Sequence, residues 1–243
     1  MSSRSTAPSN VRTQAPPSET ASLRKEIKAL LDIPLSGGGL KLGQVNCGVY
    51  AFFDYDDEPI YVGQTSEVIG TRIRRHLTNQ RTDAVAMGVL DPFEVYKIRV
   101  WPLPQFQRGI KNLDPNAWRH HLNRLEASIY HELLKGSQFG AVLNEKTPIG
   151  QDLISPKNFP FHYDRVIVSS LIKEIRGHPD IRLARRAQTI ARLAQIISER
   201  DPSPGLRRTL LIQAKRLEWL ANERFKPYEA KAESEDLLKS SED

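Results

Sequence analysis

The sequence predicts an α+β fold in which a small three-stranded antiparallel sheet, flanked by helices, is followed by an all-helical C-terminal appendix. Two β-branched and aromatic runs, residues 48–53 and 59–63, stand on either side of an acidic turn at 54–58. Runs of this composition around a short polar turn are typical of an antiparallel hairpin. From Asp164 onward the apolar residues recur at helical spacing only, which predicts helices near 165–177, 181–199 and 206–225.

The other elements follow in order from the same periodicities. Residues 23–46 predict a short helix followed by a glycine-rich joint, and residues 69–80 predict a second helix. Residues 93–100 read as the third strand. An amphipathic helix is expected over 117–135, ending at a glycine, because apolar side chains recur there at helical spacing at Leu122, Leu125, Ile129 and Leu133.

Composition divides the chain into five parts. Residues 1–22 are mostly Ser, Thr, Pro and Ala, with few bulky apolar side chains, so a disordered tail is expected there. The acidic residues 229–243 predict a second disordered tail. Between the tails we expect the helix and joint over 23–46, one domain over 47–160 and a basic helical appendix over 161–228.

The appendix carries most of the positive charge. The chain has a net charge of +6, and residues 161–228 contain 14 Lys and Arg against 7 Asp and Glu. A polyanion such as DNA is a natural partner for a basic segment. We therefore expect Arg182, Arg185 and Arg186 to contact DNA, while a merely solvated basic helix surface remains the alternative.

Several classes of protein are not expected. No stretch approaches the length of apolar sequence that a membrane span needs, and the N-terminus has no apolar core that could act as a signal peptide. The single cysteine, Cys47, permits no internal disulfide and no cysteine-based zinc site. The expectation is an intracellular, cytoplasmic protein with DNA and no membrane as partner, and with a homodimer left open.

Polar side chains gather on the predicted hairpin and the helix that follows it. Tyr50 and Tyr61 lie on the two arms, at equivalent depth and on one face if the turn is centred near Asp56, although an ordinary aromatic pair would look the same. Arg72, Arg75 and His76 share one stripe of the following helix. This stripe either binds a phosphate or is an ordinary solvated face.

Glu126 is the unusual residue of the 117–135 helix. Leu122, Ile129 and Leu133 lie at i−4, i+3 and i+7 from it, so its carboxylate borders the apolar stripe. Burial of an unpaired carboxylate raises its pKa or costs several kcal/mol, so a positive partner is expected nearby. A single carboxylate with waters and a substrate phosphate is a common Mg²⁺ site, and an ion pair with arginine is the alternative.

The order of these residues resembles the GIY-YIG nuclease superfamily over about residues 47–146. The matching elements are Gly48-Val49-Tyr50, Tyr61-Val62-Gly63, Arg72 with His76, Glu126 and Asn144. Gln64 departs from members that carry a lysine there. The resemblance implies Tyr50 as general base or part of its relay, Tyr61 as orienting the water or phosphate, and Arg72 as stabilising phosphoryl charge. It further implies His76 in proton transfer, Glu126 as the metal ligand and Asn144 as support.

The expected function is therefore that of a DNA endonuclease that uses Mg²⁺ or Mn²⁺ at a single-metal site, similar to the restriction-type members. Arg75 is expected to add a contact to DNA. The alternative is a non-catalytic DNA-binding or scaffold protein that retains the fold. The presence of Tyr50, Arg72, His76 and Glu126 argues against that alternative and favours the enzyme.

Overall fold

A computed structural model describes residues 18–36, 39–78, 90–107, 114–144, 146–148, 150, 152–199 and 203–240. Four antiparallel strands form one sheet in the order β2-β1-β3-β4, which gives the expected α+β class. The strands are β1 (Gly48–Phe53), β2 (Pro59–Thr65), β3 (Lys97–Pro102) and β4 (Tyr163–Val166). The helices are α1 (Ser18–Leu31), α2 (Ile69–Thr78), α4 (Pro115–Gly136), α5 (Ser170–Arg176), α6 (Pro179–Glu199) and α7 (Pro204–Ser240), with single 3₁₀ turns at Leu42–Gln44, Pro92–Glu94, Pro104–Phe106 and Pro156–Asn158.

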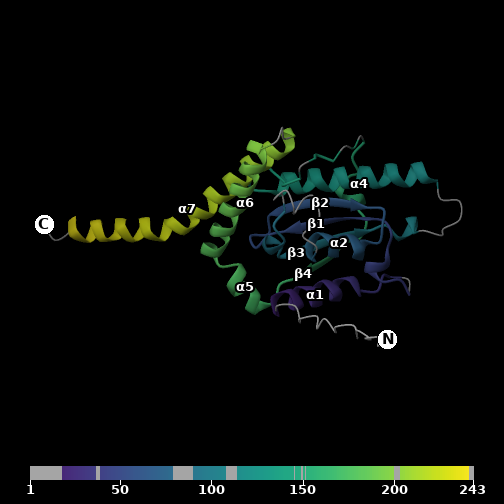
Figure 1. The fold of residues 1–243 in the computed structure, drawn as a ribbon, viewed down its shortest axis with the longest axis horizontal. Helices are drawn as coiled ribbons and strands as arrows, with labels where there is room; N and C mark the ends of the chain where they lie inside the picture. Colours follow the sequence, from purple (N-terminus) through teal and green to yellow (C-terminus); the bar gives the residue numbers. More distant parts are fainter. Residues whose placement is uncertain are drawn as a thin grey trace, which may run out of the picture.

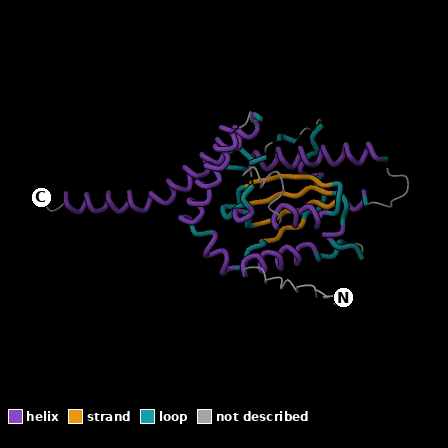
Figure 2. Tube along the Cα trace, viewed as in Figure 1, coloured by secondary structure: helices purple, strands orange, loops and turns teal. Residues whose placement is uncertain are grey.

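The sheet lies between two helical layers (Figure 1, Figure 2). Side chains alternate across a strand, so Tyr50 and Phe52 of β1 enter the core cluster that contains residues of α1 and α2. Val49, Ala51 and Phe53 enter the second cluster, with the apolar stripe of α4. The β1 run is buried along its whole length because both of its faces are covered.

The sheet has four strands, so the prediction of three is wrong, and the appendix is not helical only. β4 pairs with β3 through a short segment in which Arg99 lies opposite Asp164. The Arg99 guanidinium donates two hydrogen bonds to that carboxylate, at 2.7 and 2.8 Å. Arg165 of β4 likewise binds Glu26 of α1. This edge strand was not predicted because its side chains are polar, and their partners, Arg99 and Glu26, lie far away along the chain.

Three predicted boundaries also differ from the structure. Helix α1 begins at Ser18, so residues 18–22 are helical rather than disordered, and Glu19 in its first turn is bound by Arg176 of α5. Helix α7 continues to Ser240, through most of the segment expected as an acidic disordered tail. Strand β3 begins at Lys97 rather than Phe93, because Asp91 and Pro92 start a 3₁₀ turn in which the Asp91 carboxylate accepts a hydrogen bond from the Phe93 N–H. Residues 1–17, 37–38, 79–89 and 241–243, which include parts of both predicted tails, of the joint and of the 69–80 helix, lie outside the described residues.

The helices α6 and α7 pack on each other and against one end of the sheet, while the C-terminal part of α7 projects away from the body (Figure 1). Leu193 and Leu206 form a small core between these two helices. The side of the pair that faces the sheet carries three buried arginines, Arg182, Arg186 and Arg216, which are all at most 2% exposed. The appendix is thus joined to the sheet through charged side chains and through apolar ones, since Ile172 of α5 and Ile212 of α7 belong to the core cluster of Tyr50 and Phe52.

Candidate active site

The two tyrosines of the hairpin lie on the same face of the sheet, two residue pairs apart along the strands. Tyr50 is opposite Gly63, and Tyr61 is opposite Phe52. The register is shifted by a bulge at Phe52 and Phe53, so the tyrosines are diagonal neighbours and not at equal depth as predicted. Their ring centroids are 6.2 Å apart. The face is as expected, and the bulge, in which Ile60 is the extra residue of β2, contributes one of the two positions of the offset.

Helix α2 brings Arg72 and His76 to the tyrosines. The helix is anchored by Ile69, Ile73 and Leu77, which are buried at i, i+4 and i+8. On the adjoining stripe, the Arg72 Nε donates a hydrogen bond to the Tyr50 hydroxyl at 3.3 Å. The expected convergence of Arg72 with Tyr50 is therefore present, and the guanidinium keeps part of its surface open to solvent.

His76 is buried against the aromatic rings of the same face. Its ring centroid lies 5.2 Å from that of Tyr61 and 5.8 Å from that of Tyr50. Neither ring nitrogen has a hydrogen-bond partner among the described residues. Burial, reinforced by the charges of Arg72 and Arg75, lowers the pKa of His76 to about 4. The imidazole is therefore neutral near pH 7, with one nitrogen able to accept a proton.

Glu126 reaches the same site from α4, along the outer edge of β2. The carboxylate accepts a hydrogen bond from the backbone N–H of Gln64. Burial raises the pKa of Glu126 to about 7, although that hydrogen bond and the charge of Arg72 oppose the shift. The Glu126 charge in turn contributes to raising the pKa of both tyrosines. The carboxylate borders the apolar stripe as expected, and Arg72 is the positive group near it.

Asn144 supports the outer edge of β2 from outside the group of reactive side chains. Its Nδ2 donates to the Val62 carbonyl at 2.7 Å, and its Oδ1 accepts from the Val62 N–H at 3.0 Å. Because β2 is an edge strand, these two hydrogen bonds satisfy backbone groups of Val62 that no neighbouring strand pairs with. The side chain thereby holds the strand that carries Tyr61 and Gly63.

The tyrosine hydroxyls are protonated at neutral pH. Burial raises the pKa of Tyr50 well above its usual value, and Tyr61 and Glu126 add to the shift while Arg72 opposes it. Burial also raises the pKa of Tyr61. Both phenols can therefore donate a hydrogen bond to an incoming anion, and either accepts a proton only if its own proton is passed on.

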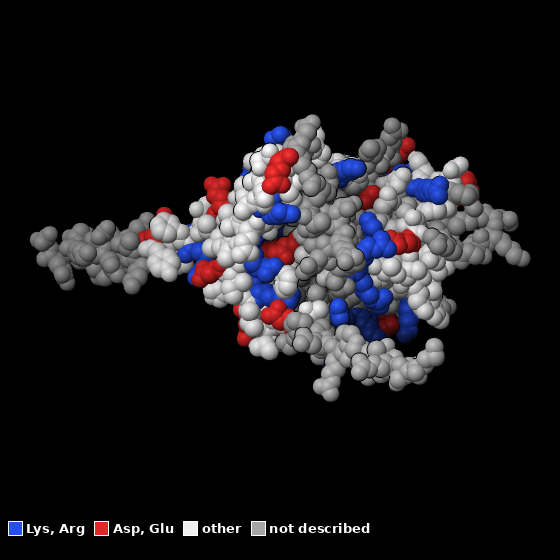
Figure 3. Space-filling view, in the orientation of Figure 1, with Lys and Arg blue, Asp and Glu red and all other residues white. Residues whose placement is uncertain are grey.

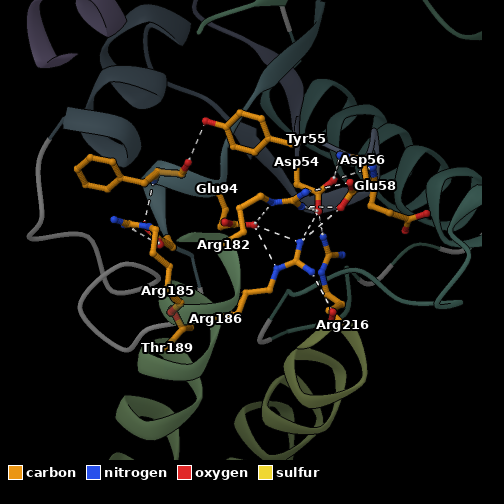
Figure 4. A network of polar contacts seen from close by, with 12 residues as sticks. Asp54, Tyr55, Asp56, Glu58, Glu94, Arg182, Arg185, Arg186, Thr189 and Arg216 are labelled. Atoms are coloured by element: carbon orange, nitrogen blue, oxygen red, sulfur yellow. Dashed lines mark hydrogen bonds and ion pairs between the residues drawn. The ribbon is translucent and has the colours of Figure 1, made fainter. Parts of the chain in front are cut away.

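The predicted DNA contacts behave differently from the other candidates. Arg182 and Arg186 are each 2% exposed and bind carboxylates of the same chain, so their assignment to a DNA-binding surface is wrong (Figure 4). Arg185 forks onto Asp91, and Arg75 forks onto Glu67 with two bonds of 2.8 Å. On the face drawn in Figure 3, basic and acidic side chains alternate over the appendix rather than forming a continuous basic patch.

Two residues that bear on the site were given no role from the sequence: Gln64, which was noted only as a departure from the family pattern, and Glu67, which was not noted. Gln64 supplies the N–H that binds the Glu126 carboxylate, and its side-chain Nε2 donates to Asn123 Oδ1 at 2.8 Å. Glu67 lies 3.9 Å from the Arg72 Nη1 and holds Arg75 in place. Glu67 is an acidic residue just before a helix, a position that favours carboxylates, and this was the available signal.

The donor set at Glu126 fits a hard divalent cation bound through few protein ligands. Within the described ranges, no group of three or more His, Cys, Asp and Glu side chains could hold a metal ion. One half-buried carboxylate with a single backbone donor is the arrangement in which Mg²⁺ keeps most of its waters and takes substrate phosphate as a further ligand. Glu126 is thus the residue that could hold such an ion.

Comparison with known proteins gives no family assignment, because no protein-family model, no curated protein and no solved structure matches the chain. None of the helices in the described part of the chain is long and apolar enough to cross a membrane.

Proposed function

We propose that the chain is a divalent-metal-dependent DNA endonuclease with a GIY-YIG-type single-metal site. The observation that supports this most is the convergence of Tyr50, Tyr61, Arg72 and Glu126 beside β2. These four groups influence one another's ionisation, and Arg72 is hydrogen-bonded to Tyr50. Phenols, a guanidinium and a carboxylate beside one another suit the hydrolysis of a phosphodiester better than they suit a structural cluster, which would pair its charges completely.

Glu126 and Arg72 have different electrostatic roles in the proposed site. Glu126 would hold Mg²⁺ or Mn²⁺, and such an ion, when bound, polarises the phosphoryl group and neutralises developing charge. Arg72 presents a forked donor to the non-bridging oxygens, with its orientation set by the hydrogen bond from its Nε to Tyr50. An electrostatic stabiliser of this kind typically contributes about 10²- to 10³-fold to the rate.

The proton of the attacking water would pass through the aromatic side of the site. Tyr50 Oη accepts that proton only as it gives up its own, because burial keeps the pKa of its phenol well above neutral. His76 is the nearby neutral imidazole, packed against both tyrosine rings and free of hydrogen bonds within the described part of the chain, and its pKa of about 4 means that it holds such a proton only transiently. Tyr61 then serves to orient the water or the phosphate by donating its hydroxyl proton in a hydrogen bond.

A plasmid-nicking assay tests the proposal. Wild-type protein should convert supercoiled DNA to nicked or linear forms with Mg²⁺ or Mn²⁺ but not with EDTA, and Glu126→Gln should lose at least 10²-fold in rate. Glu132→Gln, an exposed position on the same helix, is the matched control and should retain full activity. Retention of DNA without cleavage by wild-type protein would instead indicate the non-catalytic DNA-binding alternative.

A further inference from the structure

Three buried arginines from the C-terminal helices converge on one carboxylate of the hairpin turn (Figure 4). Arg182 and Arg186 come from α6 and Arg216 comes from α7, and all three donate to Asp54 Oδ2. Asp54 is completely buried and Arg216 is 1% exposed. Buried charges of this kind are tolerated only when they are paired. Separating the helices from the turn would leave these charges unpaired, which would cost a large amount of folding free energy.

The other oxygen of Asp54 organises the turn itself. Asp54 Oδ1 accepts hydrogen bonds from the backbone N–H groups of Asp56, at 2.9 Å, and Glu58, at 3.0 Å. The Asp54 N–H also donates to the Glu58 carbonyl at 3.0 Å. One carboxylate therefore joins the turn, through Oδ1, to helices α6 and α7, through Oδ2.

The same turn determines how the two arms of the hairpin meet. Tyr50 lies four residues before Asp54, and Tyr61 lies three residues after Glu58. Phe52 and Phe53, between Tyr50 and the turn, flank the bulge that contributes to the offset of two residue pairs between the tyrosines. Helix α7 makes a second contact with the site, because the Arg208 Nη2 donates to the carbonyl of Asn144 at 3.3 Å. Asn144 in turn holds Val62 of β2.

We infer that Arg216, together with Arg182 and Arg186, is a positioning residue that sets the relative placement of Tyr50 and Tyr61 through Asp54. The C-terminal helices are then a structural part of the catalytic unit rather than a separate DNA-binding appendix. The catalytic consequence rests on the proposed function, whereas the placement of the tyrosines does not.

The charge balance of the cluster supports this role. The carboxylates of Asp54, Asp56 and Glu94 face the three guanidinium groups, so the cluster has no excess positive charge to offer to DNA. Arg185, which directly precedes Arg186 on α6, is likewise paired with Asp91. The arginines of α6 that face the sheet are thus neutralised by carboxylates of the same chain.

The test compares Arg216→Met with Arg224→Met. Arg224 also joins α7 to α6, through a bidentate ion pair with Asp180, but that pair is exposed and does not contact the hairpin. Three quantities are measured: kcat for plasmid nicking, the Kd for a DNA duplex in EDTA across a salt series, and the ¹⁹F spectrum of protein that contains 3-fluorotyrosine. The Tyr50 and Tyr61 resonances are assigned by Tyr→Phe substitution.

Arg216→Met should lower kcat at least tenfold, leave Kd and its salt dependence within twofold of wild type, and shift the ¹⁹F resonances of Tyr50 and Tyr61. Arg216→Lys, which retains the charge, should recover part of kcat and also serves if Arg216→Met does not fold. Arg224→Met should match wild type in all three measurements.

Two results would overturn the inference. One is unshifted ¹⁹F resonances in a folded Arg216 variant. The other is a loss of DNA affinity with a flatter salt dependence at unchanged kcat, which would restore a DNA-binding role to this segment. If wild-type protein does not nick DNA, the proposed function fails, but the ¹⁹F comparison of the Arg216 and Arg224 variants still decides the positioning.

Discussion

Tyr50 and Gly63 lie directly opposite each other in the β1–β2 pair, and the phenol fills the space that a side chain at position 63 would occupy. A Cβ at position 63 would lie 2.6 Å from the Tyr50 Oη and 2.8 Å from Tyr61 Cε1. Both tyrosine rings therefore depend on the same glycine. The glycine is required by close approach alone, because Gly63 is not among the glycines with positive φ.

Gly63→Ala should displace the Tyr50 ring and break its hydrogen bond with Arg72. Overpacking of this kind costs about 1–3 kcal/mol in the free energy of unfolding, and the displaced hydroxyl should reduce nicking by at least tenfold. Urea denaturation and the nicking assay measure the two effects. Gly136→Ala, where a Cβ would meet nothing within 4 Å, is the control and should be neutral in both. A fully active Gly63→Ala protein would contradict this placement of Tyr50.

Asn144→Asp should loosen β2 locally, because the substitution removes the donor to the Val62 carbonyl and places a carboxylate beside it. The expected loss is about 1–3 kcal/mol, the cost of leaving a buried acceptor unsatisfied. Hydrogen exchange at the Val62 amide, which should become faster by at least tenfold, reports the change directly. The exposed Asn222→Asp on α7 should leave that amide unchanged. Equal exchange in both variants would argue against a supporting role for Asn144.

The candidate site was predictable because it depends on short-range spacing and on residue chemistry. Arg72 and His76 share a face through the period of a helix, and an unusual carboxylate at the border of an apolar stripe identified Glu126. The offset between Tyr50 and Tyr61 was not predictable, because it depends on a bulge that has no sequence signal of its own.

The role of Arg182 and Arg186 was predicted wrongly because a sequence does not show whether a charged side chain faces solvent or a partner within the chain. Arg182 and Arg186 read as a basic helix face, but their partners Asp54 and Glu94 are about 130 and 90 residues away along the chain. The β4 strand was missed for the same reason, since Asp164 matches Arg99 only across the sheet. Ion pairs between residues far apart in the chain therefore determined both structures, and neither the local sequence pattern nor the net charge of a segment indicates such pairs.

Arg182→Ala should therefore act on stability and not on DNA affinity. The substitution leaves Asp54 and Asp56 without one of their guanidinium partners, and breaking a buried ion pair in this way costs about 3–5 kcal/mol. Urea denaturation measures the cost. The exposed Arg192→Ala on the same helix should lose less than about 0.5 kcal/mol. A stable Arg182→Ala protein with weakened DNA binding would instead indicate that this arginine contacts DNA.

Glu126 should make the metal-free protein less stable as the pH rises. Its pKa is about 7 in the folded chain against 4.5 as its ordinary value, so between these values the folded state binds more protons than the unfolded state. Stability attributable to this group is thus present below about pH 4.5 and is lost as the pH rises through about 7. The full loss is on the order of 3 kcal/mol.

Glu126→Gln isolates this contribution, because the amide oxygen still accepts the Gln64 N–H while the charge is absent. In EDTA, the variant should be more stable than wild type at pH 9 by on the order of 3 kcal/mol, and the two should converge below pH 4.5. Thermal or urea denaturation at several pH values gives the difference. Millimolar Mg²⁺ should narrow it at pH 9, since an ion that binds only the folded carboxylate stabilises wild type alone. A stability difference that does not vary with pH would mean that the carboxylate is solvated and unavailable for the role assigned to it.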